Sequence, residues 1–265
     1  MDVYFCSFAD SRMSASLQRI KKQALSFNMF KDIYVFDEKD LDFSFKQLNK
    51  DKLILGSRGY GYWIWKPYII QRVLTKLSDG DILVYADAGC HLNIRGKERF
   101  SIYFDLLIKN ELGLLVFEQI GLLEKHWTKG DIFDFFNVRD NESITDSYQR
   151  AGGIFLIRKN KKIEDVFTLW NHICGEKFFL IDDSPSFSPN FEGFIENRHD
   201  QSIISIISKL YNAAVLPSSE IYASDWNTMY NYPIWAKRDK KLKWNYLMLR
   251  KLQTACRIIK KLLYP

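Results

Sequence analysis

The chain contains short runs that are apolar on every side, and segments with helical periodicity separate them. The most continuous run, residues 82–86 (ILVYA), follows a turn at residues 78–81. A strand that is apolar on both faces has to be covered on both faces, which is typical of a parallel sheet flanked by helices. The pattern therefore predicts an α/β fold with a mainly parallel sheet.

Strands are expected at the apolar runs, and helices where apolar residues recur at three- and four-residue steps. The expected strands are residues 2–8, 32–36, 82–86, 114–117, 153–157 and 213–216. The expected helices are residues 14–27, 67–77, 104–110, 163–173 and 201–210. Residues 118–150 and 175–198 are polar, rich in aromatic residues and less regular. We expect substrate-facing loops there.

Composition excludes several classes of protein. With 265 residues and a hydrophobic fraction of 47%, the chain can bury one large core. Its four cysteines have no C-x-x-C spacing, so they indicate neither a disulfide framework nor a zinc ribbon, and they fit a reducing compartment. The N-terminus has no signal-peptide pattern, and no run approaches about 18 apolar residues. We therefore expect no bilayer-spanning helix.

Charge divides the chain into two parts. Residues 237–265 hold ten of the 38 basic residues and one of the 32 acidic ones, a net charge of +9, which leaves −3 on the preceding 236 residues. Apolar residues between positions 242 and 263 recur with helical spacing opposite a basic face, which predicts an amphipathic helix. We expect a domain at residues 1–236 and a basic tail at residues 237–265.

Such a tail suits the anionic cytoplasmic surface of a membrane, where each nearby basic residue contributes about 1 kcal/mol. A solvated helix packed on the domain is an alternative, and a contact with nucleic acid is another. The body of the chain contains no recognisable nucleic-acid-binding module. The expected location is therefore cytoplasmic, peripheral on the inner face of the cytoplasmic membrane, with no nucleic-acid partner.

Asp87 is the most informative candidate for a functional residue. It follows the apolar strand at residues 82–86, and the small residues Ala88 and Gly89 come next. In open α/β sheets ligands bind beyond the carboxyl ends of the strands, so a carboxylate here can face a ligand or a metal ion. The Asp-x-Asp string at residues 79–81 precedes the strand and is expected at the opposite end of the sheet, as a turn.

Residues 58–67 (RGYGYWIWKP) combine aromatic rings, glycines and two cations before a predicted helix. Arg58, Lys66 and the helix N-terminus can bind a diphosphate. An aromatic ring such as Tyr62 can stack on a base or sugar. Trp63 and its neighbour Trp65 are equally well explained as core anchors of the loop.

These motifs, followed by A-G-G-I-F at residues 151–155 and R-H-D-Q-S-I at residues 198–203, resemble bacterial glycosyltransferases of the GT-A fold. The nearest kin are enzymes encoded in O-antigen, lipooligosaccharide and capsule clusters. The resemblance covers roughly residues 1–235 and implies a GT-A-like, Rossmann-type sheet and a UDP-linked sugar donor. It also implies Mn²⁺ or Mg²⁺ between the diphosphate and an Asp-x-Asp carboxylate. This chain has Asp87-Ala88-Gly89 in place of Asp-x-Asp, so the second carboxylate is missing and Asp87 is the one metal ligand that the motif provides. One carboxylate can suffice, because Mg²⁺ commonly takes only one or two.

The resemblance further implies roles for side chains at strand and helix ends. The implied donor-binding residues are Ser7, Asp10, Arg12, Asp37, Arg58, Tyr62, Lys66, Ala86, Asp87, Lys237 and Arg238. The implied acceptor-side residues are Trp63, Trp127, Gly152, Gly153 and His199. Two alternatives stay open: Asp10 can cap a helix, and the cations at 237 and 238 can simply begin the tail.

Asp200 opens a predicted helix and can be either its N-cap or a carboxylate at the reaction centre. An inverting transferase needs a base for the acceptor hydroxyl, whereas a retaining one uses such a group to stabilise the oxocarbenium-like sugar. Glu196 and Glu124 are further candidates for the base.

The sequence thus predicts a membrane-surface glycosyltransferase that acts in surface-polysaccharide synthesis. On the resemblance, it transfers a galactosyl or galactofuranosyl unit from a UDP-sugar to a lipid-linked saccharide. The alternative is a non-catalytic, membrane-associated carbohydrate-binding or scaffold protein on a degenerate transferase fold. The missing second carboxylate favours this alternative, and the concentration of Asp, Lys and Arg at strand and helix ends favours the enzyme.

Overall fold

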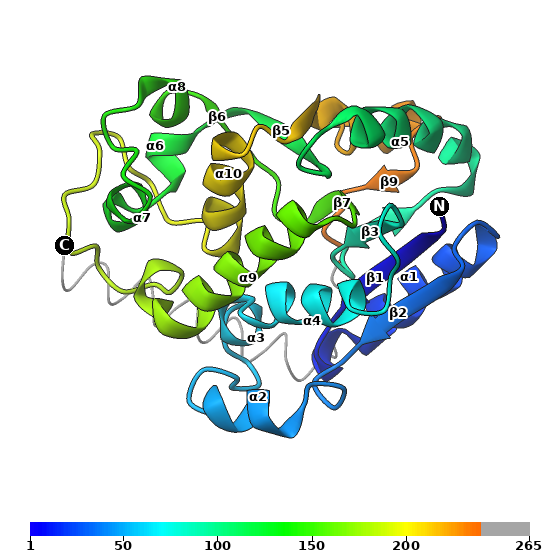
Figure 1. The fold of residues 1–265 in the computed structure, drawn as a ribbon, viewed down its shortest axis with the longest axis horizontal. Helices are drawn as coiled ribbons and strands as arrows, with labels where there is room; N and C mark the ends of the chain where they lie inside the picture. The colour runs from blue at the N-terminus through cyan, green and yellow to red at the C-terminus, as the bar shows by residue number, and fades with distance from the viewer. Residues whose placement is uncertain (240–265) are drawn as a thin grey trace.

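The computed structural model describes residues 1–239 and places a seven-stranded sheet between two layers of helices (Figure 1). The strand order is β2-β1-β3-β7-β5-β6, and β8 also pairs with β5. The strands of this sheet are β1 (Val3–Phe8), β2 (Asp32–Phe36), β3 (Ile82–Ala86), β5 (Leu114–Leu123), β6 (Tyr148–Arg150), β7 (Ile154–Arg158) and β8 (Ala214–Pro217). A separate pair joins β4 (His91–Leu92) to β9 (Ile234–Trp235).

The sheet is mixed, with most strands in one direction. Parallel pairs join β1 to β2, β1 to β3 and β5 to β8, and β7 runs antiparallel to both of its neighbours, β3 and β5. The prediction of a mainly parallel sheet is confirmed in this sense. The reversal has a simple cause: the chain leaves the carboxyl end of β5, stays on that side through residues 124–147, and has to re-enter the sheet from that end.

Helices cover both faces of the sheet, as the apolar runs predict. One core lies under α1 (Ser14–Ser26) and α5 (Phe100–Lys109), and the other under α4 (Trp65–Leu74), α9 (Lys161–Glu176) and α10 (Asp200–Leu210). Neighbouring residues of β1 enter different cores: Phe5 packs in the first, and Cys6 in the second. The shorter helices are α2 (Phe43–Leu48), α3 (Gly59–Tyr62), α6 (Glu124–Trp127), α7 (Gly130–Phe135) and α8 (Glu142–Thr145).

The predicted elements are present, and the differences lie at their ends. Strand β3 has the predicted bounds, whereas α4 begins at Trp65, two residues before the proline that was expected to open it. Residues 118–150, expected to be loops, contain the end of β5, three short helices and β6. The second half of β5 is partly exposed and pairs irregularly with β6, so it lacks the apolar run that would have predicted a strand.

The predicted helix within residues 242–263 lies outside the described residues, as does most of the basic tail. In residues 1–239, no helix is both long enough and apolar enough to cross a bilayer.

Candidate functional site

Polar loops gather where β1, β2 and β3 end, since these parallel strands finish at one edge of the sheet. Asp10 follows β1, Asp37 follows β2 and Asp87 follows β3. The antiparallel β7 begins at the same edge, after Gly152 and Gly153. Four segments that the sequence singled out therefore meet there.

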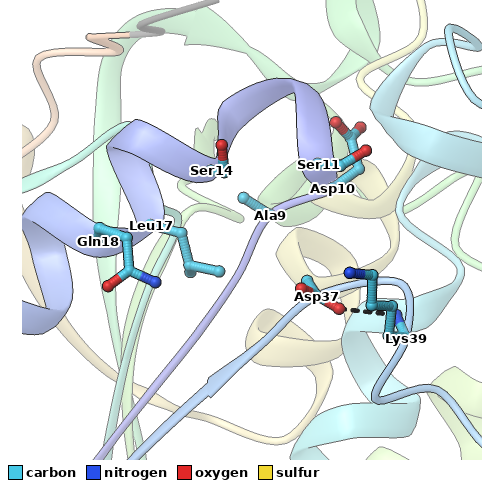
Figure 2. A pocket seen from close by; sticks show the side chains of 8 residues that line it. All are labelled: Ala9, Asp10, Ser11, Ser14, Leu17, Gln18, Asp37 and Lys39. Atoms are coloured by element: carbon cyan, nitrogen blue, oxygen red, sulfur yellow. Dashed lines mark hydrogen bonds between the residues drawn. The ribbon is translucent and has the colours of Figure 1, made fainter.

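The ends of β1 and β2 and the start of α1 enclose a pocket of about 240 Å³. Figure 2 shows side chains of α1 on one side of it, and Asp37 and Lys39 on the other. Its lining residues are Ala9, Asp10, Ser11, Ser14, Leu17, Gln18, Asp37 and Lys39. Two of the predicted donor-binding residues, Asp10 and Asp37, thus line the same pocket.

The side chains around this pocket are only partly those predicted. Asp10 accepts hydrogen bonds from the backbone N–H and the guanidinium of Arg12, so it caps the turn Ser11–Met13 while it lines the pocket. The capping alternative is therefore confirmed for Asp10. Ser7 is fully buried and does not line the pocket; its hydroxyl has no hydrogen-bond partner within residues 1–239.

A buried lysine joins two of these segments to the start of α10. The Nζ of Lys66, on α4, lies 2.5 Å from Asp200 Oδ2, 2.9 Å from the carbonyl oxygen of Gly152 and 3.3 Å from Asp87 Oδ1. These three acceptors match the three donors of an ammonium group. Only 2% of the Lys66 side chain is exposed, so we correct the prediction that it binds a phosphate: it is the counter-ion of two carboxylates.

The two carboxylates differ in their access to solvent. Asp87 keeps 36% of its side chain exposed and accepts a hydrogen bond of 2.7 Å from the Tyr85 hydroxyl. Asp200 keeps 6%, and burial raises its pKa to about 6 against the pull of Lys66. Burial disfavours the charge of Lys66, but the two carboxylates outweigh it and raise the pKa of Lys66. Lys66 therefore stays protonated at neutral pH, and Asp200 ionises above about pH 6.

Asp200 is therefore not the cap of α10. The cap position is His199, and it makes no side-chain capping bond. The carboxylate of Asp200 lies against Lys66 instead, which joins the start of α10 to α4.

Gly152 and Gly153 allow these close contacts. A Cβ on Gly153 would lie 2.9 Å from Asp87 Oδ2, and a Cβ on Gly152 would lie 2.8 Å from the Cα of Gln201. The backbone N–H of Asp87 donates to the carbonyl of Gly153. The two glycines were expected to allow backbone to approach a sugar, whereas here they let α10 and Asp87 approach the sheet.

His199 lies in a strained and aromatic setting. Its φ of 58° and those of Tyr62 (53°) and Trp63 (61°) fall where side chains are disfavoured, at a typical cost of about 1–3 kcal/mol each. Both rings contact the imidazole, with centroids 5.2 and 5.7 Å away. Burial and the charge of Arg58 lower the pKa of His199 to about 4, so it is neutral.

The Nδ1 of His199 bonds the carbonyl of Ile181 at 2.6 Å, which leaves Nε2 buried 3.8 Å from Asp183 Oδ1. Asp183 also accepts hydrogen bonds from Arg58 at 3.1 Å and from the Tyr62 hydroxyl at 2.9 Å. The sequence analysis does not predict Asp183 as a site residue, because Asp183 lies in the irregular segment at residues 175–198. The one available signal was that this segment is expected to be a substrate-facing loop.

Arginines gather beside His199. Arg58 and Arg198 both lie near Glu196, at 3.7 and 3.5 Å, and the guanidinium of Arg198 lies 4.1 Å above the ring of Trp127. The sequence analysis includes Arg198 in the motif at residues 198–203 and predicts no role for it. Burial, together with the charges of Arg238 and Arg58, lowers the pKa of Arg198.

The first residues of the predicted tail pack against the Asp87 loop. Asp239 donates its backbone N–H to the carbonyl of Gly89, and the Cα of Arg238 lies 3.4 Å from the place of a Cβ on Gly89. Arg19, on α1, bonds both the Asp239 carboxylate (2.8 Å) and the carbonyl of Ala88 (2.9 Å). The backbone of Arg238 thus packs beside the loop that carries Asp87.

Other predicted residues are not brought to this rim. Glu124 is fully buried and bonds Thr128, Gln149 and Lys209, and a carboxylate with no exposed surface cannot reach a bound acceptor. The ammonium of Lys237 lies over the ring of Trp235, 4.5 Å from its centroid. Ala86 is buried in the sheet opposite Ile154.

The residues present do not fit a divalent metal ion. Residues 1–239 contain no group of three His, Cys, Asp or Glu side chains that can hold a metal, so an ion here would rest on Asp87, the donor phosphates and water. One oxygen of Asp87 already faces the Tyr85 hydroxyl and the Lys66 ammonium. Two unit charges about 4 Å apart repel by about 4 kcal/mol near a protein surface, and a divalent ion would double that repulsion from Lys66.

Comparison with known proteins gives a fold and no close relative. No protein-family model and no curated protein sequence matches the chain. A glycosyltransferase involved in the glycosylation of the major capsid of PBCV-1 superposes with a TM-score of 0.51 and 12% identity, over 90% of this chain and 97% of that one. Mouse xyloside xylosyltransferase 1 gives a TM-score of 0.48 and 8% identity, over 89% and 97% of the two chains. The galactosyltransferase LgtC, bound to donor and acceptor sugar analogues, gives 0.45 and 14%, over 96% of each.

Identities this low carry information about the fold alone. The first of these similarities shows that the chain has a glycosyltransferase-like fold, in agreement with the predicted GT-A-like α/β architecture.

Proposed function

We propose that this protein is a glycosyltransferase that moves a sugar from a nucleotide-sugar donor to a saccharide acceptor. The observation that carries the proposal is the meeting of Asp87, Lys66 and Asp200 at the carboxyl end of β3, next to the pocket at the ends of β1 and β2. Ligands of open α/β sheets bind at such edges. The glycosyltransferase-like fold supports the same conclusion.

In this proposal the nucleoside occupies the pocket and the sugar lies toward Asp87. The carboxylate of Asp37 is the group that would bond ribose or base, since it lines the pocket and accepts a hydrogen bond only from the Lys39 backbone within residues 1–239. Lys66 and Asp200 act as positioning residues: they hold Asp87 at the sheet edge and are themselves almost inaccessible.

Of the three carboxylates predicted as candidates for the base, Glu196 is the one that a bound acceptor can reach. Glu196 keeps 29% of its side chain exposed, compared with 6% for Asp200 and none for Glu124. In an inverting transfer Glu196 would accept the proton of the acceptor hydroxyl. In a retaining transfer, Asp87 would instead stabilise the oxocarbenium-like sugar.

The finer parts of the proposal rest on the sequence resemblance: a UDP-linked galactosyl or galactofuranosyl donor, a lipid-linked saccharide acceptor and a role in surface-polysaccharide synthesis. The basic tail would hold the enzyme at the anionic inner face of the cytoplasmic membrane. Replacing Lys251, Arg257 and Lys260 by glutamate tests this part and spares residues 237–239. Unchanged binding to anionic liposomes would contradict the membrane role.

The test of the activity is a donor panel. The full-length protein is incubated with UDP-, GDP- and dTDP-sugars, with Mn²⁺ or with EDTA, and release of nucleotide is measured. We expect turnover with one donor, and loss of that turnover in Asp87→Asn, which keeps the shape of the side chain and removes its charge.

The competing function is a carbohydrate-binding or scaffold protein on a degenerate transferase fold. A ligand at 100 times its Kd raises the unfolding free energy by about 2.7 kcal/mol, so binding without turnover is easily measured. No turnover and no stabilisation by any nucleotide would favour the scaffold.

A further inference from the structure

Three arginines from separate segments lie near one another: Arg198 shares Glu196 with Arg58 and senses the charge of Arg238. Arg58 comes from the loop before α3, Arg198 from the loop before α10, and Arg238 from the segment after β9. The first two share Glu196, at 3.7 and 3.5 Å, distances longer than a good hydrogen bond. The backbone of Arg238 packs on Gly89, two residues after Asp87.

Arg198 has unused donor capacity. Its Nη1 contact with Glu196 is loose, and 23% of its side chain stays exposed, so a ligand can reach the guanidinium. Its Nε is buried and makes no hydrogen bond within the described part of the chain. The guanidinium is held flat over Trp127, 4.1 Å from the ring centroid, which orders it without engaging its N–H groups. A planar donor fork of this kind matches the oxygens of a phosphate.

The charges of the cluster also favour an anion. Arg58, Arg198 and Arg238 contribute three positive charges, and their neighbours Asp183 and Glu196 contribute two negative ones. Burial lowers the pKa of Arg198 most, and the nearby charges of Arg238 and Arg58 lower it further, so both oppose the charge of Arg198. A diphosphate would relieve this repulsion.

At the same edge, Lys66 lies beside Asp87, where an enzyme with an Asp-x-Asp pair would hold its metal ion. We infer that this enzyme transfers its sugar without a divalent metal, and that Arg58, Arg198 and Arg238 bind and neutralise the donor diphosphate in its place. This inference rests on the proposed function and deepens it by naming what stabilises the leaving group.

The step balances as follows. The bond between the anomeric carbon and the diphosphate oxygen breaks, and its electron pair stays on the leaving nucleoside diphosphate. The acceptor oxygen bonds to the anomeric carbon, and its proton passes to Glu196. Protonation removes the carboxylate charge between Arg58 and Arg198 as the leaving group gains its charge, so both arginines act on the diphosphate when it is most negative.

The test measures binding as well as turnover. Calorimetry with UDP, GDP and dTDP, each with EDTA and then with Mn²⁺ or Mg²⁺, should give for the preferred nucleotide a Kd that changes less than about threefold on adding metal. Turnover in EDTA should be within about twofold of that with metal. Arg198→Gln should weaken binding of the diphosphate by tenfold or more, whereas the nucleoside without phosphates should bind both proteins equally.

Arg95→Gln is the matched control, because Arg95 is a cation on Tyr230, 4.8 Å from the ring centroid, with no contact to the arginine cluster among the described residues. It should bind the nucleotide like the wild type. Binding or turnover that requires metal, or an Arg198→Gln protein that binds the diphosphate normally, would overturn the inference and leave the transferase proposal intact. Absence of any nucleotide binding would instead overturn the transferase proposal itself.

Discussion

Replacing Lys66 by methionine tests the buried charge cluster directly. The change removes the ammonium that bonds Asp200, Asp87 and the Gly152 carbonyl, and it leaves a buried carboxylate without a counter-ion. Removing one partner of a buried ion pair typically costs about 3–5 kcal/mol. We expect Lys66→Met to lower the free energy of unfolding by this amount at pH 8, measured by urea denaturation with tryptophan fluorescence.

The size of the loss should depend on pH in a definite direction. The folded-state pKa of Asp200 is already raised to about 6, and without Lys66 it rises further. A carboxyl whose pKa is raised on folding contributes stability at low pH and loses it as the pH rises through the folded pKa. In the wild type, the contribution of Asp200 to the free energy of unfolding is therefore lost by about pH 6. In the variant the free energy of unfolding continues to fall above pH 6, by up to about 1.4 kcal/mol per pH unit.

The difference between the two proteins should therefore be small near pH 5 and grow between pH 6 and 8. A double variant, Lys66→Met with Asp200→Leu, leaves no charge of the pair buried and should recover most of the stability. A difference that is the same at pH 5 and pH 8 would refute the reasoning, because the loss would then come from packing and not from the charge of Asp200.

Three further outcomes follow from the geometry. Burial lowers the pKa of His199 from 6.5 to about 4, so its contribution to the free energy of unfolding is present above pH 6.5 and is lost as the pH falls toward 4. His199→Phe has no such titration, so its free energy of unfolding in urea should depend less on pH in this range. Gly153→Ala should reduce donor turnover tenfold or more, because the added Cβ would lie 2.9 Å from Asp87 Oδ2, and unchanged kinetics would contradict this contact. Gly175→Ala is its control: nothing lies within 4 Å of the added Cβ on α9, so turnover should be unchanged and stability should rise by about 0.5–1 kcal/mol in thermal or urea unfolding.

The sheet could be predicted because its signal is local. A strand that is apolar on every side, such as β3, can only be buried on both faces, and its end locates Asp87 without any knowledge of the partner strands. The reversed direction of β7 could not be predicted, because it depends on where residues 124–147 travel before the strand begins. Sequence patterns report periodicity and carry little information about direction.

The role of Lys66 was out of reach for a related reason. The prediction identified the residue and assigned it to a phosphate, because it stands with Arg58 among glycines and aromatic rings just before a predicted helix. Its main partner, Asp200, is 134 residues away, and only the packing of α4 and α10 on the same face of the sheet buries both side chains. Contacts between residues far apart in the sequence decide whether a charged side chain is buried. They therefore also decide whether a lysine binds an anionic ligand or serves as the counter-ion of a carboxylate.

The junction of Arg19, Asp239 and the carbonyl oxygens of Ala88 and Cys90 has a mechanical consequence. Asp239 is the last residue that the structure describes, and its backbone N–H donates to Gly89, in the loop that carries Asp87. Because one guanidinium bonds both sides of this junction, replacing Arg19 would loosen residue 239 and the Asp87 loop together.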